Sequence, residues 1–145
     1  MKTKVLNVLC FLFGLMMINA GLNKIFEYIP MPADMPEHML KMYAAFKTIG
    51  WLLPLVAVVE VIGGILFMIP RTRAFGAIVV FPPVVGILLT HIFQAPEGLP
   101  IAIVLLIINV IVIFENKEKF LALLKKSNGN PEGARQEQEI LNSEF

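Results

Sequence analysis

Residues 49–69 read IGWLLPLVAVVEVIGGILFMI, a run of 21 positions in which Glu60 is the one charged side chain. A helix rises about 1.5 Å per residue, so roughly 20 apolar residues cross a hydrocarbon layer about 30 Å thick. An open sheet of such strands would leave backbone groups unpaired in lipid. The run therefore predicts a membrane-spanning α-helix with an acid near its middle.

Working outward from this run, the chain contains three more apolar stretches of similar character: residues 5–26, 74–93 and 99–114. The whole chain is 57% hydrophobic and 16% charged, whereas soluble domains average about 45–50% and about 25%. Charged or proline-containing turns separate the runs at residues 70–73, 95–98 and 115–119. We therefore predict an all-α fold, an integral membrane four-helix bundle.

The predicted domain organisation is a transmembrane domain at residues 1–126 and a polar, mobile cytoplasmic tail at residues 127–145. Lys2 and Lys4, the apolar run after them and Ala20 also fit a cleavable signal peptide. Cleavage would leave three spans. Basic residues favour four spans with both termini cytoplasmic. They lie before the first run, between the second and third runs and after the fourth, and four spans place all three groups on the cytoplasmic side. These residues are Lys2, Lys4, Arg71, Arg73, Lys117, Lys119, Lys125 and Lys126.

A longer link joins the first two spans. Pro30, Pro32 and Pro36 keep its first part extended or turning. Asp34 and Glu37 have the spacing of a capping box just before apolar residues that recur at helical spacing across residues 39–46. These features predict a short amphipathic helix on the outer membrane surface, and an irregular loop is the alternative.

Glu60 is the most informative polar residue, because an ionisable group at mid-depth costs at least a few kcal/mol and usually faces the bundle interior. Helical spacing places it on one face with Gly63 and Gly64. Asn109 lies at nearly the same depth in the fourth span, so we expect the two side chains to share a hydrogen bond. Glu60 is interpreted either as a structural carboxyl or as a group that handles a ligand or protons.

Lys24 and His91 lie near the outer ends of their spans, roughly 10–15 Å above Glu60 at about 1.5 Å per residue. Lys24 is therefore not expected to reach Glu60 unless the first helix is shifted inward. Each also has a simpler interpretation: Lys24 as a lysine that snorkels to headgroups, and His91 as an interfacial histidine.

Two sets of residues divide the first span. Asn19 and Asn23 are four apart and share a face, whereas Gly14, Gly21 and Lys24 lie nearer another face. The two faces should contact different partners. In the third span, Pro82, Pro83 and Gly86 predict a bend, which either opens a pocket or fits the helix packing. The glycines assigned to helix packing are Gly14, Gly21, Gly63, Gly64 and Gly86.

Several chemistries lack the residues they need. Cys10 is the single cysteine, so a dithiol relay within the chain is excluded. His38 and His91 are too few and too separated for a metal site, and no phosphate loop, nucleophile elbow or haem, flavin or cluster ligand set is present. A net charge of +1 does not suggest nucleic acid. We therefore expect no cofactor held by the chain alone, and no catalysis by the chain alone.

The motifs of this sequence resemble those of the DoxX family of small four-helix bacterial membrane proteins. The similar parts are Ala20-Gly21-Leu22-Asn23-Lys24 closing the first span, Glu60 with Gly63-Gly64, Pro70-Arg71-Thr72-Arg73 in the turn and His91 near the end of the third span. The resemblance covers roughly residues 5–115. It implies a multi-pass protein of the bacterial cytoplasmic (inner) membrane. The family takes its name from a subunit of a thiosulfate–quinone oxidoreductase, and some relatives are linked to oxidant resistance.

Three functions fit these observations. In the first, the chain is the membrane component of a quinone-linked redox or oxidant-resistance system, with Lys24, His91 and Asn23 as donors to a quinone and a partner subunit supplying electrons. In the second, it is a small proton-coupled transporter with Glu60 as the coupling group. In the third, it is a non-catalytic scaffold subunit or homo-oligomer in the bilayer. The ligand or proton-handling candidates are Glu60, Lys24, His91, Asn109, Asn23 and Asn19.

Overall fold

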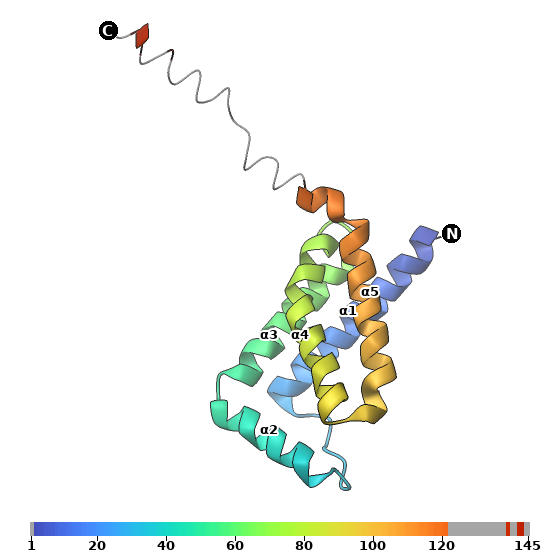
Figure 1. Cartoon of the computed structure of the whole chain (residues 1–145), viewed down its shortest axis with the longest axis vertical. Coiled ribbons are helices and arrows are strands. Elements are labelled where there is room, and N and C mark those ends of the chain that lie inside the picture. Colours follow the sequence, from blue (N-terminus) through green and yellow to red (C-terminus); the bar gives the residue numbers. More distant parts are fainter. Residues whose placement is uncertain (1, 122–138, 140–141, 144–145) are drawn as a thin grey trace. The chain divides into compact units, whose positions relative to one another are not determined.

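The computed structural model describes residues 2–121, 139 and 142–143, and this part of the chain is helical with no strand. The elements in order are α1 (Lys2–Phe26), α2 (Glu37–Ile49), α3 (Leu52–Met68), α4 (Arg73–Phe93), the short 3-10 helix η1 (Pro96–Gly98) and α5 (Leu99–Glu115) (Figure 1). The prediction of an all-α fold is confirmed. The chain forms two units, Met1–Phe114 and Glu115–Phe145, and the elements of the first carry the site. Most of the predicted tail, residues 127–145, lies outside the described residues.

Three helices are long and apolar enough to cross a membrane: Lys4–Phe26, Arg73–Phe93 and Pro96–Glu115. The predicted second span is shorter than expected, because α3 has 17 residues and is about 26 Å long at about 1.5 Å per residue. It follows α2 after a break, and the two helices are bent by 91°. The structure therefore contains three candidate spans, or four if α2 and α3 together form one broken span.

The bend between α2 and α3 occurs at Gly50, whose φ is 75°, a value that residues with a Cβ rarely adopt. Gly50 N–H donates to the carbonyl of Lys47 and ends α2. The helix predicted around residues 39–46 is present as α2, which lies at the end of the bundle that holds the α1–α2 link (Figure 1). The next helix begins at Leu52 rather than at the predicted residue 49.

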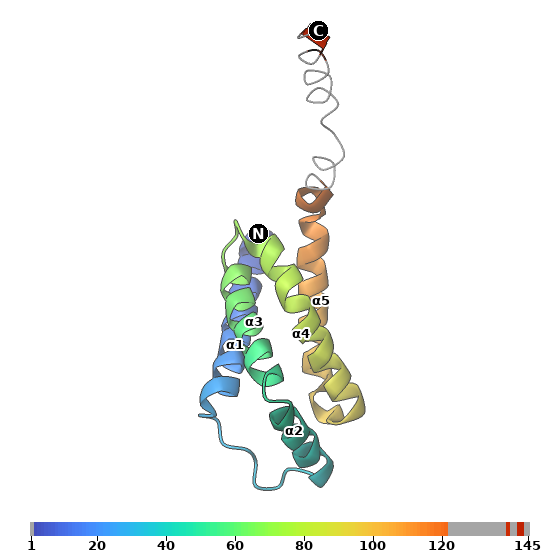
Figure 2. The same cartoon turned by 90° about the vertical axis from the view of Figure 1, so that its left-hand side faces the viewer.

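Helix α1 packs closely and antiparallel against α3, and α3 packs against α4 (Figure 2). Glycines permit this approach. A Cβ at Gly64 would lie 2.7 Å from the carbonyl oxygen of Gly14, and one at Gly21 would lie 2.6 Å from that of Ala57. A Cβ at Gly76 would likewise meet the backbone of Phe67. The closest helix contacts are therefore backbone against backbone, as is common for small residues in membrane helices.

The core lies between these helices and the inner face of α5. Phe13 of α1 stacks on Phe67 of α3 with ring centroids 4.3 Å apart. Helix α5 buries one side chain per turn along one stripe, at Ala102, Leu105, Asn109 and Val112. That spacing is the one that positions on a single helical face require.

Arg73 belongs to the core rather than to the exposed turn in which the sequence places it. It is 6% exposed. Its guanidinium donates to the carbonyls of Phe67 and Met68 at the end of α3 and to Oδ1 of Asn7 in α1. Arginine therefore satisfies carbonyls that a helix C-terminus leaves without partners, and it ties three helices together at this end.

Candidate functional site

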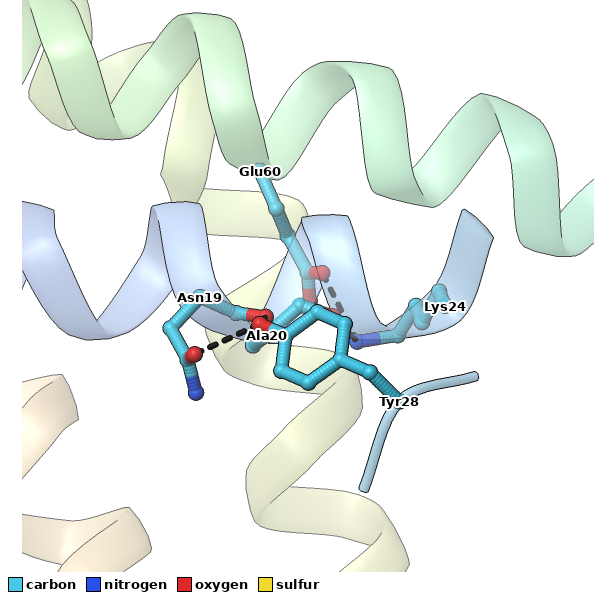
Figure 3. A network of polar contacts seen from close by, with 5 residues as sticks. All are labelled: Asn19, Ala20, Lys24, Tyr28 and Glu60. Carbon is cyan, nitrogen blue, oxygen red and sulfur yellow. Dashed lines mark hydrogen bonds and ion pairs between the residues drawn. The ribbon is translucent and has the colours of Figure 1, made fainter. Parts of the chain in front are cut away.

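The central polar feature is an ion pair between α1 and α3. Lys24 Nζ lies 2.7 Å from Oε2 and 3.0 Å from Oε1 of Glu60, and 3.5 Å from the carbonyl oxygen of Ala20 (Figure 3). The Glu60 side chain is 1% exposed and that of Lys24 is 28% exposed. The carboxylate is therefore almost fully shielded by the bundle, while the lysine stem leads outward from it.

The expectation that Lys24 cannot reach Glu60 is wrong, and helix register explains why. The contacts of Gly14 with Gly64 and of Gly21 with Ala57 place Lys24 Cα about six residues, or about 9 Å, beyond Glu60 along the axis. Helical side chains lean toward the N-terminus of their own helix. On α1 this direction carries the lysine stem back past Ala20 and down to Glu60.

The predicted hydrogen bond between Glu60 and Asn109 is also wrong. Both residues are fully buried, but Nδ2 of Asn109 donates to the carbonyl of Ala77 in α4 at 3.0 Å. Its Oδ1 is buried with no hydrogen-bond partner among the described residues. Equal depth did not make the two side chains partners, because Glu60 turns to α1 while Asn109 turns to α4.

Asn19 and Asn23 organise the chain that leaves α1. Tyr28 Oη donates to Oδ1 of Asn19 at 2.6 Å, and Ile29 N–H donates to Oδ1 of Asn23 at 2.8 Å. Figure 3 shows Tyr28 folding back on α1 to make the first of these bonds. The two faces of α1 do have different partners, since Gly21 and Lys24 contact α3.

The link is also fastened to α2. Lys47 lies 2.5 Å from the carboxylate of Glu27, which accepts a hydrogen bond from Tyr43 at 3.2 Å. The hydrogen bond with Lys47 lowers the pKa of Glu27 from its ordinary value of 4.5 and raises the pKa of Lys47 from 10.5. The stability that this ion pair contributes is fully present between the two ordinary pKa values, 4.5 and 10.5. It is lost as pH falls through the pKa of Glu27 or rises through that of Lys47. Both groups are exposed, so the contribution is small.

An apolar pocket of about 810 Å³ opens between α2, α3 and α4, and we call it the inner pocket. Lys24, Glu60, Tyr43, Thr90 and His91 supply its polar groups. The rest of its wall is aliphatic and aromatic, and includes Phe46, Leu55, Val59, Ile78, Pro83 and Ile87. This size and this mixture of a largely apolar wall with a few polar groups are typical of small-molecule sites.

His91 reaches the inner pocket with one nitrogen already engaged. Its Nδ1 lies 2.9 Å from the carbonyl oxygen of Ala95, and a carbonyl can only accept, so Nδ1 carries the proton. In the neutral ring Nε2 is then an acceptor. The ring packs on Gly98, where an added Cβ would collide with it. Sequence reasoning missed Gly98, and its position in the 95–98 turn was the available signal.

Gly86 packs against no other described helix. Apart from the neighbouring backbone of α4, no described atom lies within 4 Å of the position its Cβ would take, and Gly86 lines the inner pocket together with Pro82 and Pro83. The two prolines lack N–H groups, so the carbonyls of Ile78 and Val79 lose their regular helical donors. Ile78 and Val79 both line the inner pocket. Their carbonyl oxygens are backbone acceptors to which Pro82 and Pro83 donate no hydrogen bond.

The residues that the structure describes contain no group of three His, Cys, Asp or Glu side chains that could hold a metal ion. Comparison of the chain with protein-family models, with curated proteins and with solved structures found no match.

Proposed function

We propose that this chain is a DoxX-like, multi-pass protein of the bacterial cytoplasmic membrane that binds a quinone-type molecule in the inner pocket. In this proposal it is the membrane component of a quinone-linked redox or oxidant-resistance system. The observation that carries the proposal is the inner pocket, where Lys24, Glu60 and His91 share one apolar cavity of about 810 Å³.

The polar groups suit the two states of such a ligand. A quinone presents two carbonyl acceptors. The longest of the three contacts of Lys24 Nζ is the 3.5 Å one to the carbonyl oxygen of Ala20, and the ammonium group can exchange that contact for a quinone carbonyl while it stays paired with Glu60. A quinol presents hydroxyl donors, which Nε2 of His91 can accept, because Nδ1 is committed to Ala95. Converting quinone to quinol takes up two electrons and two protons. The electrons would come from a partner subunit, and the Lys24–Glu60 pair and His91 are titratable groups of the pocket that can exchange protons.

The apolar wall suits the remainder of the ligand. Leu55 and Ile78 line the inner pocket and are 51% and 47% exposed, so the pocket opens sideways on the surface of the bundle. In a bilayer this opening would face lipid, and a hydrocarbon tail could extend through it without burying polar groups.

Occupancy of the inner pocket can be tested by filling it. We expect Gly86→Leu to weaken binding of decylubiquinone at least tenfold, because Gly86 lines the cavity, a Cβ added there has open space around it, and the larger leucine side chain would occupy cavity volume. Binding is measured in nanodiscs by quenching of Trp51, the single tryptophan, which directly precedes the pocket residues Leu52 and Leu53. Leu89→Phe is the control. Leu89 is exposed on the same helix, so this substitution enlarges a side chain that lies outside the pocket.

Equal affinities for the wild type and Gly86→Leu would refute binding in this pocket. If the wild type shows no saturable binding, a proton flux in liposomes that disappears in Glu60→Gln would favour the transporter. Absence of both binding and flux would favour the scaffold.

The proposed topology has four spans, with α3 as the second, and both termini in the cytoplasm. Its support is the alternation of basic flanks. In a Cys10→Ala background, we expect Glu97→Cys in η1 to react with an impermeant maleimide added to intact cells. Glu118→Cys should react only after the membrane is opened. Labelling of Glu118→Cys in intact cells would reverse the orientation or change the number of spans.

A further inference from the structure

A second pocket of about 400 Å³ lies between the end of α1, the link and α2, and we call it the outer pocket. Its wall contains four methionines: Met31, Met35, Met39 and Met42. They are half of the eight methionines in the chain and fall within 12 consecutive positions. Elsewhere the apolar surfaces of this protein are built mainly from leucine, isoleucine and valine.

The backbone brings these methionines in from two directions. Met39 and Met42 are three apart on α2 and so share a face. Met35 precedes the helix, where its N–H donates to the carbonyl of Pro32 in a turn. Met31 comes from the extended part of the link and is 45% exposed. The other three are about half-buried, so the cavity is accessible from outside through the link.

The charged groups beside the outer pocket already have partners. Lys24 Nζ is held by Glu60, and Oε1 of Glu27 is held by Lys47 and Tyr43. Carboxylate oxygens suit hard cations, so the thioether sulfurs are the lining atoms best suited to a soft cation. Thioethers are soft, uncharged ligands that select Cu(I) over harder divalent ions.

We propose that the outer pocket binds one Cu(I) ion through the thioether sulfurs of Met31, Met35, Met39 and Met42. The ion keeps its charge and oxidation state on binding, so the step needs no electron donor or acceptor. Met42 lines both pockets, whereas Met35 and Met39 line only the outer one, so substitutions at Met35 and Met39 test this site separately from the quinone proposal.

The test measures Cu(I) affinity of the full chain in nanodiscs. All variants carry Cys10→Ala, so that the thiol cannot compete. Titration is anaerobic, with ascorbate and a chromophoric Cu(I) chelator as the competitor. We expect one Cu(I) per chain, and affinity at least 100-fold lower in Met35→Leu/Met39→Leu. Leucine replaces methionine at little cost in packing.

Met16→Leu/Met68→Leu is the matched control, because these methionines lie in α1 and α3, away from the pocket. We expect its Cu(I) affinity to stay within threefold of the parent. X-ray absorption of the loaded parent should show sulfur neighbours only. The proposal is overturned if the parent binds no Cu(I) against the chelator, if both double variants lose affinity equally, or if nitrogen and oxygen dominate the first shell. Decylubiquinone binding should be unchanged in Met35→Leu/Met39→Leu, so failure of either proposal is recognised separately.

Discussion

Lys24→Met should destabilise the protein by about 3–5 kcal/mol, because it leaves the Glu60 carboxylate buried without its partner. Glu60→Leu should cost less, since the Lys24 side chain is 28% exposed and can turn to the surface. The double variant Lys24→Met/Glu60→Leu should lie within about 1 kcal/mol of the wild type, because two apolar side chains replace the whole pair. The measurement is reversible unfolding in mixed micelles as a double-mutant cycle.

The asymmetry between the two single variants follows from the structure alone and does not require a ligand. If the double variant is no more stable than Lys24→Met, the ion pair is not the source of the loss. If the double variant folds normally and also fails to bind decylubiquinone, the pair has a role in the inner pocket beyond stability. Asn109→Leu is a control for any buried polar residue in the bundle, since Asn109 contacts α4 and not this pair.

Two glycine-to-alanine substitutions should have opposite effects. Gly64→Ala should destabilise by about 2 kcal/mol, because its Cβ would lie 2.7 Å from the carbonyl oxygen of Gly14 and force α1 away from α3. Gly86→Ala should stabilise by up to about 1 kcal/mol, because alanine restricts the unfolded chain more than glycine does and its Cβ meets no described atom within 4 Å.

The same unfolding experiment compares these two variants, and each is the control for the other. A loss of stability in both would mean that α4 has a partner over Gly86, such as a second copy of the chain. No loss of stability in Gly64→Ala would mean that α1 and α3 are not in backbone contact. It would also contradict the helix register that explains how Lys24 reaches Glu60.

The sequence placed the helices well where the cause is local. Apolar runs long enough for a bilayer became α1, α4 and α5, and α2 formed after the prolines of the link. The predicted capping box is wrong, because Pro36 occupies the N-cap of α2 and no side chain caps the helix. The second span was less accurate. Gly50 adopts a positive φ and turns the chain by 91° before α3 begins, so Ile49 ends α2 and residues 50–51 are a bend rather than the first turn of a span.

The site depended on information that no single segment carries. Counting residues from span ends put Lys24 and Glu60 at different depths and paired Glu60 with Asn109. The observed partners are Lys24 with Glu60, and Asn109 with Ala77. Depth is a one-dimensional quantity, whereas hydrogen bonding requires the correct rotation of each helix and the lean of each side chain along its axis.

By itself, the sequence determined that this is an all-helical chain with several apolar helices long enough to cross a membrane, and that its buried acid faces other helices. Hydrophobic length and the cost of burying charge are properties of a segment and its solvent. Only the tertiary structure decided the partner of that acid, the burial of Arg73 and the existence of the inner and outer pockets. These depend on helix register, set by glycine contacts between α1 and α3, and on the angle at Gly50, which are relations between segments far apart in the chain.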